Sequence, residues 1–291
     1  MYIRDMLKKK TPTVSCELFP PKQGSDLERA YEVVRETSGL KPDFISVTYG
    51  AGGSVPSNML EMAKLVRSCG VEALAHLTCV SSSREKISSF ISELEESGIE
   101  NILALRGDIP EGYAHDEKTN YTYAYELVSE IKARGGFSIG AACYPEGHPE
   151  SASLEQSLEH LKIKVDAGCD FLTTQMFFDN NVLYGFLYRA LSRGIDVPVL
   201  AGIMPVTNKK QIKRMVALSG QLLPPTLMRM VDKFGDDPKA MEQAGIAYAT
   251  EQIIDLIANG VRGIHIYTMN RPDIAGKIMA NINYLWDSNN G

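Results

Sequence analysis

Residues 138–176 read SIGAACYPEGHPESASLEQSLEHLKIKVDAGCDFLTTQM, in which two short apolar segments flank a longer amphipathic one. The central part carries apolar residues at three- and four-residue spacing: Leu154, Leu158, Leu161 and Val165. That spacing predicts a helix with one apolar stripe. The flanking segments, 138–143 and 170–176, have the length of strands. The stretch therefore predicts a strand–helix–strand unit with two parallel strands.

The same alternation runs through the whole chain. Strand-sized segments lie at residues 13–18, 43–49, 72–78, 101–106, 138–143, 170–176, 197–203 and 263–268. Eight such units in 291 residues favour a closed (β/α)8 TIM barrel over an open doubly wound sheet, because closure gives every strand two neighbours. We expect a single domain over residues 1–291, with an extra helix or loop after the seventh strand at 219–238. A long loop at 109–122 follows the fourth strand.

The charge and composition exclude several classes of partner. The net charge is −6, and the longest basic run, residues 8–10, is too short to follow a phosphate backbone. No apolar run approaches the roughly 18 residues of a membrane helix. The first residues also lack the apolar core of a signal peptide. We therefore expect a cytoplasmic protein that binds neither nucleic acid nor a membrane.

The cysteines do not form a recognisable framework. They are Cys16, Cys69, Cys79, Cys143 and Cys169. Their number is odd and they contain no CxxC pair, so we expect reduced thiols. A zinc site could pair His148 with Cys143 or Glu146, but no third ligand follows at a useful spacing. We expect no metal.

Polar residues collect where the predicted strands end. In a TIM barrel these carboxyl-terminal ends meet at one mouth, which holds the active site. Alternate strand residues face the barrel interior, so Glu17 shares a side with Ser15. Together these residues predict a site for a polar ligand that carries a ring, although solvated rim residues would explain any one of them alone. They are Glu17, Thr48, His76, Thr78, Arg106, Asp108, Tyr144, Gln175 and Arg271.

Glu17 is the first candidate for chemistry. It lies between Cys16 and Leu18 and is followed by Phe19-Pro20-Pro21, so its carboxyl group has apolar neighbours. Burial there would raise the pKa of Glu17 and keep it protonated near neutral pH, as a general acid requires. An ion-paired or helix-capping glutamate is the alternative.

Two further motifs favour recognition of a charged ring system. Arg106-Gly107-Asp108 combines two opposite charges with a glycine that lets the backbone approach a flat ligand. A structural ion pair at the strand end is the alternative. The loop 144–149 adds the aromatic ring of Tyr144 and the imidazole of His148, whereas we interpret His160 and His265 as structural.

Several common motifs are missing from the sequence. It has no GxGxxG dinucleotide fingerprint, no GxxxxGK[ST] phosphate loop and no GxSxG nucleophile elbow. These absences weaken phosphoryl-transfer and serine-hydrolase hypotheses. A nicotinamide cofactor would have to bind without a Rossmann domain.

Six motifs resemble, in order, those of bacterial methylenetetrahydrofolate reductases, and the similarity covers residues 14–284. They are CELFPP (16–21), SVTYGA (46–51), AHLTC (75–79), LALRGD (103–108), YPEGHP (144–149) and TQMFFD (174–179), with YTMNR (267–271) near the end. The resemblance implies FAD bound at the barrel mouth. It also implies reduction of 5,10-methylenetetrahydrofolate to 5-methyltetrahydrofolate by hydride from the reduced flavin, in one-carbon metabolism and methionine synthesis.

The resemblance also implies roles for individual residues. Glu17 would protonate the folate to open its one-carbon bridge, and Asp108 would lower the flavin potential and orient the folate. The implied folate contacts are Asp108, Gln175, Gln211 and Arg271. The implied FAD contacts are Thr48, His76, Arg106, Gly107, Asp108, Tyr123, Ala124, Tyr144 and His148, with Lys164 on the diphosphate. The chain departs from the family near the adenine end, at Ser157, His160 and Ile163.

The resemblance leaves the electron donor open. Nicotinamide-using members place an aromatic residue on the helix after the seventh strand, where this chain has Met215. The donor is therefore either NADH or NADPH, or an electron-delivering partner subunit. We expect the chain to form a homo-oligomer.

Three other functions fit a barrel of this kind. Another flavin barrel, such as a proline dehydrogenase, would share the cofactor, but the Glu17 motif argues against it. A non-redox, folate-binding methyltransferase barrel would bind the pterin without flavin, so a yellow purified protein would exclude it. A non-catalytic subunit of a larger complex is disfavoured because Glu17, Asp108 and Gln175 are all present.

Overall fold

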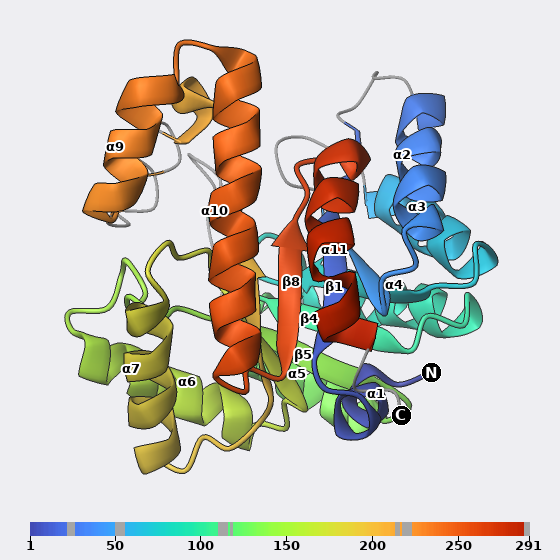
Figure 1. The fold of residues 1–291 in the computed structure, drawn as a ribbon. Coiled ribbons are helices and arrows are strands. Elements are labelled where there is room, and N and C mark those ends of the chain that lie inside the picture. The colour runs from blue at the N-terminus through green and yellow to red at the C-terminus, as the bar shows by residue number, and fades with distance from the viewer. Residues whose placement is uncertain are drawn as a thin grey trace.

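The structure is a computed structural model that describes residues 1–21, 27–49, 56–109, 116, 119–212, 216 and 223–287. Its strands are parallel and close into one barrel in chain order (Figure 1). They are β1 Thr13–Leu18, β2 Phe44–Val47, β3 Glu72–Thr78, β4 Asn101–Leu105, β5 Ser138–Cys143, β6 Phe171–Thr174, β7 Val199–Ile203 and β8 Gly263–Tyr267. The predicted (β/α)8 barrel is confirmed.

Helices alternate with the strands and cover the barrel from outside (Figure 1). They are α1 Ile3–Lys9, α2 Leu27–Gly39, α3 Pro56–Ser68, α4 Arg84–Glu96, α5 Ala124–Arg134, α6 Leu154–Asp166, α7 Asn180–Ser192, α9 Pro225–Phe234, α10 Pro238–Ala258 and α11 Pro272–Asp287. The predicted extra helix after the seventh strand is α9, which lies beside the upper part of α10 in Figure 1, beyond the level of the carboxyl end of β8. Residues 219–222, most of the expected loop at 109–122 and Met215 lie outside the described residues.

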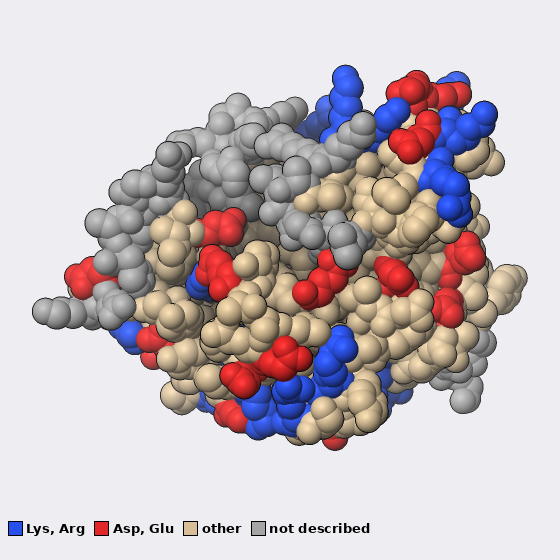
Figure 2. Space-filling view, turned by 90° about the vertical axis from the view of Figure 1, so that its left-hand side faces the viewer, with Lys and Arg blue, Asp and Glu red and all other residues tan. Residues whose placement is uncertain are grey.

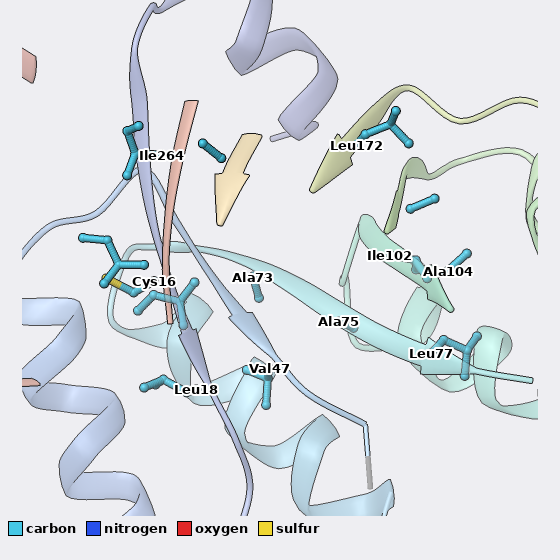
Figure 3. Close-up of a cluster of buried hydrophobic side chains, with 14 of the residues drawn as sticks. Cys16, Leu18, Val47, Ala73, Ala75, Leu77, Ile102, Ala104, Leu172 and Ile264 are labelled. Carbon is cyan, nitrogen blue, oxygen red and sulfur yellow. The ribbon is translucent and has the colours of Figure 1, made fainter. Parts of the chain in front are cut away.

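The main hydrophobic core lies between the strands and the surrounding helices. Alternate strand residues point outward into it, among them Cys16, Leu18 and Val47 (Figure 3). The predicted stripe of α6 contributes the buried Leu158 and Leu161. Because these residues face the helices, their neighbours in β1, including Ser15 and Glu17, face the barrel interior.

A second apolar cluster fills the lower half of the barrel interior. Ile3 and Leu7 of α1 pack against the inward-facing Phe44, Phe171 and Leu200. The helix is held there because the amide of Ile3 donates to Oδ1 of the buried Asn101 at 2.8 Å. Helix α1 therefore closes the amino-terminal end of the barrel, and the polar end is the mouth.

Helix α11 meets the segment between α1 and β1. The indole Nε1 of Trp286, in α11, donates to Asp43 at 2.9 Å. Lys10 pairs with the same carboxylate at 2.8 Å, and its Nζ lies 4.5 Å from the centre of the indole ring. Asp43 also accepts the amide of Val14 at 2.7 Å. This cluster joins the segment before β1 to the last helix.

The cysteines and the charged side chains of the sequence are distributed as follows in the fold. All five cysteines are free, and four of them are buried. Acidic and basic side chains lie side by side on the face shown in Figure 2 and form no broad field of one sign there. Within the described residues, none of the helices combines the length and apolar character that a membrane span requires.

Candidate active site

Glu17 lies at the carboxyl end of β1, with Ser46 of β2 and Tyr267 of β8 as its neighbours across the sheet. Its side chain faces the interior and is 19% exposed. The apolar neighbours named from the sequence, Cys16 and Leu18, are fully buried on the opposite side of the strand. Glu17 is therefore a carboxyl group at the inner wall of the mouth, in the predicted position.

Two histidines flank this carboxyl group. Nε2 of His76 lies 3.6 Å from Oε2 of Glu17, and Nε2 of His265 lies 3.5 Å from the same oxygen. Both imidazoles are buried. The assignment of His265 as merely structural was therefore incomplete, because its ring contacts the candidate acid. The strand parity that placed Glu17 could have found it, since His265 is the β8 partner of Ser15.

Ser15 contacts the inner nitrogen of His265. The Ser15 oxygen lies 2.7 Å from Nδ1 of His265 and 3.2 Å from the carbonyl oxygen of Ile264. Its single hydroxyl proton goes to Ile264 when Nδ1 carries a proton and to Nδ1 when it does not, so the direction of the short contact depends on the tautomer of His265. Nε2 of His265 faces Glu17, where it can accept from a protonated carboxyl group or donate to a carboxylate.

The electrostatics of Glu17 differ from the sequence prediction. Burial raises the pKa of Glu17, but the hydrogen bond with His265 and the positive charges of His76 and His265 lower it more, so the pKa lies below its ordinary value. The predicted raised pKa is therefore wrong for this structure. Burial also lowers the pKa of His76 to about 4, so this imidazole is neutral at neutral pH.

On the β4 side, Arg106 forms an ion pair across two loops. Its two terminal nitrogens donate to the two carboxylate oxygens of Glu150 at 2.5 and 2.7 Å. The alternative of an ion pair at this strand end is thus realised, although the partner is Glu150 and Asp108 is exposed at the rim. Gly107 has φ +82, and an added Cβ would lie 2.8 Å from Cβ of Thr78. The backbone conformation of this turn therefore requires glycine at position 107.

The loop after β5 and helix α6 add aromatic and cationic groups beside Arg106. The rings of Tyr144 and His148 meet edge to face at 4.6 Å. Lys164 of α6 donates to the carbonyl of Ala142 at 2.8 Å, and burial lowers its pKa. Among the described residues, no carboxylate pairs with this ammonium group. Arg106 and Lys164 therefore provide two cations for an anionic ligand.

The remaining predicted cofactor contacts lie around the same mouth. Tyr123 begins the loop-to-helix junction of α5, where its exposed ring stacks on Tyr125 at 5.9 Å, and Ala124 is buried behind it. The backbone there is held by Glu126, which accepts the amide of Tyr123 at 2.8 Å. Thr48 follows β2, and its buried hydroxyl has no partner among the described residues.

The predicted folate contacts divide between two places. Gln211 and Arg271 line one pocket of about 280 Å³, which also includes Asn208, Glu242 and Tyr267. Arg271 pairs there with Glu242 at 3.1 Å and with Asp273 at 2.7 Å. Gln175 instead follows β6, where its side-chain oxygen accepts the amide of Met176. The structure thus places Arg271 and Gln211 together, and Gln175 on a separate strand end.

A (β/α)8 barrel with a histidine-flanked carboxyl group on one side of its mouth and two cationic side chains on the β4–β5 side is typical of barrel enzymes that combine proton transfer with an anionic ligand. Comparison with known proteins narrows this class. Residues 2–283 match the family model for methylenetetrahydrofolate reductase. The chain belongs to the methylenetetrahydrofolate reductase family.

Individual relatives agree with this assignment. The chain is 38% identical to the 5,10-methylenetetrahydrofolate reductase of Pectobacterium carotovorum subsp. carotovorum, over 90% of this chain and 87% of that protein. It is 36% identical to the enzyme of the same name from Escherichia coli K12, over 90% and 88%. The Arabidopsis thaliana protein named methylenetetrahydrofolate reductase (NADH) 1 is 33% identical over 98% of this chain and 51% of its own length.

A solved structure supports the fold. An uncharacterized protein from Clostridium thermocellum that binds two copies of 5-methyl-5,6,7,8-tetrahydrofolic acid superposes with a TM-score of 0.66. The two chains share 13% identity, and the match covers 98% of this chain and 99% of the other.

Proposed function

We propose that this protein reduces 5,10-methylenetetrahydrofolate to 5-methyltetrahydrofolate, using FAD. The observation that carries the proposal is Glu17, a carboxyl group at the barrel mouth whose Oε2 lies 3.5 Å from Nε2 of His265, in a chain of this family. When bound, FAD supplies the hydride. Residues of this chain would bind the cofactor and the folate and move the proton.

The residues present fit such a cofactor. Its diphosphate needs cations, and Arg106 and Lys164 lie beside each other on the β4–β5 side of the mouth. The half-buried Lys164 ammonium group, whose acceptor is a carbonyl, would gain most from an anion. The rings of Tyr144, His148 and Tyr123 offer surfaces for the flat parts of the cofactor, and the unpartnered Thr48 hydroxyl offers a hydrogen bond.

Glu17 acts as the acid in this proposal. Because its pKa is lowered, Glu17 is a carboxylate at neutral pH and must take up a proton at Oε2, on the side of His265, before it delivers that proton to the folate nitrogen that leaves the one-carbon bridge. Loss of that nitrogen turns the bridge into an electrophile. His265 and Ser15 are positioning residues, since they hold the proton in place without contacting the substrate. Asp108, Gln175, Gln211 and Arg271 would orient the folate around this point.

Replacement of Glu17 tests the proposal. Glu17→Gln keeps the shape of the side chain but removes the proton that the reaction requires. We expect FAD binding and flavin reduction to persist while methylenetetrahydrofolate reduction falls about 10²- to 10⁴-fold. Glu96→Gln, an exposed change on α4, serves as the control and should behave like wild type. Full turnover in Glu17→Gln would contradict the acid role, and a wild-type protein that binds no FAD would contradict the proposed function.

The donor of electrons is part of the proposal. We propose that the donor is either NADH or NADPH, or an electron-delivering partner subunit, and that the working form is a homo-oligomer. One relative, from Arabidopsis thaliana, is named for NADH. Anaerobic mixing of the oxidised protein with NADH or NADPH decides between them, because bleaching of the flavin identifies a nicotinamide donor. We also propose a cytoplasmic location, which the five free thiols support.

A further inference from the structure

The cationic corner of the mouth contains one carboxylate that the proposed reaction does not use. Arg106, Lys164 and the ring of His148 lie close enough on the β4–β5 side to interact: besides burial, Arg106 and Lys164 lower the pKa of His148, and Arg106 lowers the pKa of Lys164. Glu150, in the loop between β5 and α6, forms an ion pair with Arg106. No role was predicted for Glu150 from the sequence.

The geometry of this pair is that of a built contact. The Arg106 guanidinium donates with both terminal nitrogens, so its outer edge is fully used by the two oxygens of Glu150. The loop supports the carboxylate, because the Glu150 amide donates to Nδ1 of His148 at 3.1 Å. The Arg106 side chain is 23% exposed and the Glu150 side chain 61%. The Glu150 carboxylate can therefore leave the pair and be solvated at a low cost in free energy.

The same edge of Arg106 is the one that a phosphate group would bind. Carboxylates and phosphates both accept the paired donors of a guanidinium, and one edge cannot serve both at once. We propose that Glu150 is an internal competitor of the cofactor phosphate: it occupies Arg106 when the cofactor is absent and leaves when a phosphate group of the cofactor arrives. This inference rests on the proposed function, because it takes FAD as the ligand.

The competition predicts that removing the charge of Glu150 strengthens cofactor binding. Apoprotein is titrated with FAD, and quenching of flavin fluorescence gives the Kd without any turnover. For Glu150→Gln we expect a Kd about 2- to 5-fold lower than for wild type, the effect of removing one largely exposed ion pair. Glu155→Gln removes an exposed carboxylate from the first turn of α6 and is the matched control, which should leave the Kd unchanged.

A double substitution shows whether Glu150 acts through Arg106. If it does, adding Glu150→Gln to an Arg106→Gln protein leaves the Kd of that protein unchanged. Weaker or unaltered FAD binding in Glu150→Gln, an equal gain in Glu155→Gln, or a gain that persists without Arg106 would each overturn the inference. A wild-type protein that fails to bind FAD would overturn the proposed function as well, which separates the two failures.

Discussion

Ser15, His265 and Glu17 form a chain of hydrogen-bonding groups that leads from the barrel interior to its mouth. The serine oxygen sets the orientation of the imidazole, and the imidazole faces the carboxyl group. A proton in such a chain can lie on either partner of the last contact. Glu17 would therefore transfer the proton, whereas His265 would set the pKa at which Glu17 binds it.

Replacement of His265 should change the pH dependence of the reaction. Since His265 lowers the pKa of Glu17, His265→Asn raises it, and the protonated acid then persists to higher pH. We expect kcat to fall roughly 10²-fold while the decline of kcat/KM with rising pH moves to higher pH. His160→Asn, on the exposed side of α6, is the control. An unmoved pH profile would refute the positioning role.

Gly107 allows a second test at the level of one residue. Its φ of +82 strains any side chain, and an added Cβ also meets Thr78 at 2.8 Å. Gly70 has nearly the same φ, +81, but nothing within 4 Å. We expect Gly70→Ala to cost about 1 kcal/mol of unfolding free energy and Gly107→Ala about 1–3 kcal/mol more. Equal midpoints in urea for the two variants would show that the contact with Thr78 is relieved without cost.

At the scale of elements, helix α1 is the closure of the lower barrel. Leu7→Ala removes a buried side chain from the cluster that contains Phe44 and Phe171, so we expect it to cost about 2–5 kcal/mol. Lys8→Ala changes the neighbouring exposed residue and should cost little. Urea unfolding measures both. A Leu7→Ala protein as stable as Lys8→Ala would mean that α1 contributes nothing to closing the barrel.

The elements themselves were predictable to different degrees. The bounds of β1, β3 and β5 match the prediction, because alternation of apolar residues and the hydrogen-bonded ladder end together there. Strands β2 and β6 are shorter than predicted, at Phe44–Val47 and Phe171–Thr174. The predicted ranges included residues beyond the ladder, such as Thr48 and Gln175, because the extent of pairing depends on residues elsewhere in the chain.

At the scale of the whole molecule, the position of the site could be predicted from the fold, but the charges and pKa values within the site could not. Once eight parallel strands were predicted, the positions of Glu17, Arg106 and Gln175 at one mouth followed. The lowered pKa of Glu17 depends on His76 and His265, which reach it only through barrel closure. The pairing of Arg106 with Glu150 likewise depends on the path of a loop, which no periodicity in the sequence describes.

Buried His76 couples the stability of the whole fold to pH. Its folded pKa of about 4 lies below the ordinary value of 6.5, so between these values the unfolded chain binds a proton that the folded chain does not. Stability should therefore fall as the pH decreases from 6.5, by about 2 kcal/mol at pH 5. Urea unfolding at pH 7 and pH 5 measures this loss, and His76→Asn should reduce it. The same loss in His76→Asn would assign it to other groups.

The contact of Trp286 with Asp43 and Lys10 has an optical consequence. Trp286 is the single tryptophan of the chain, and it lies where the segment before β1 meets the last helix. Its fluorescence emission therefore reports on this contact alone. Loss of the indole hydrogen bond to Asp43, or of the Lys10 ammonium group above the ring, should change the emission. Tryptophan fluorescence of this protein therefore follows the separation of α11 from the segment before β1, and it reports barrel opening without an added label.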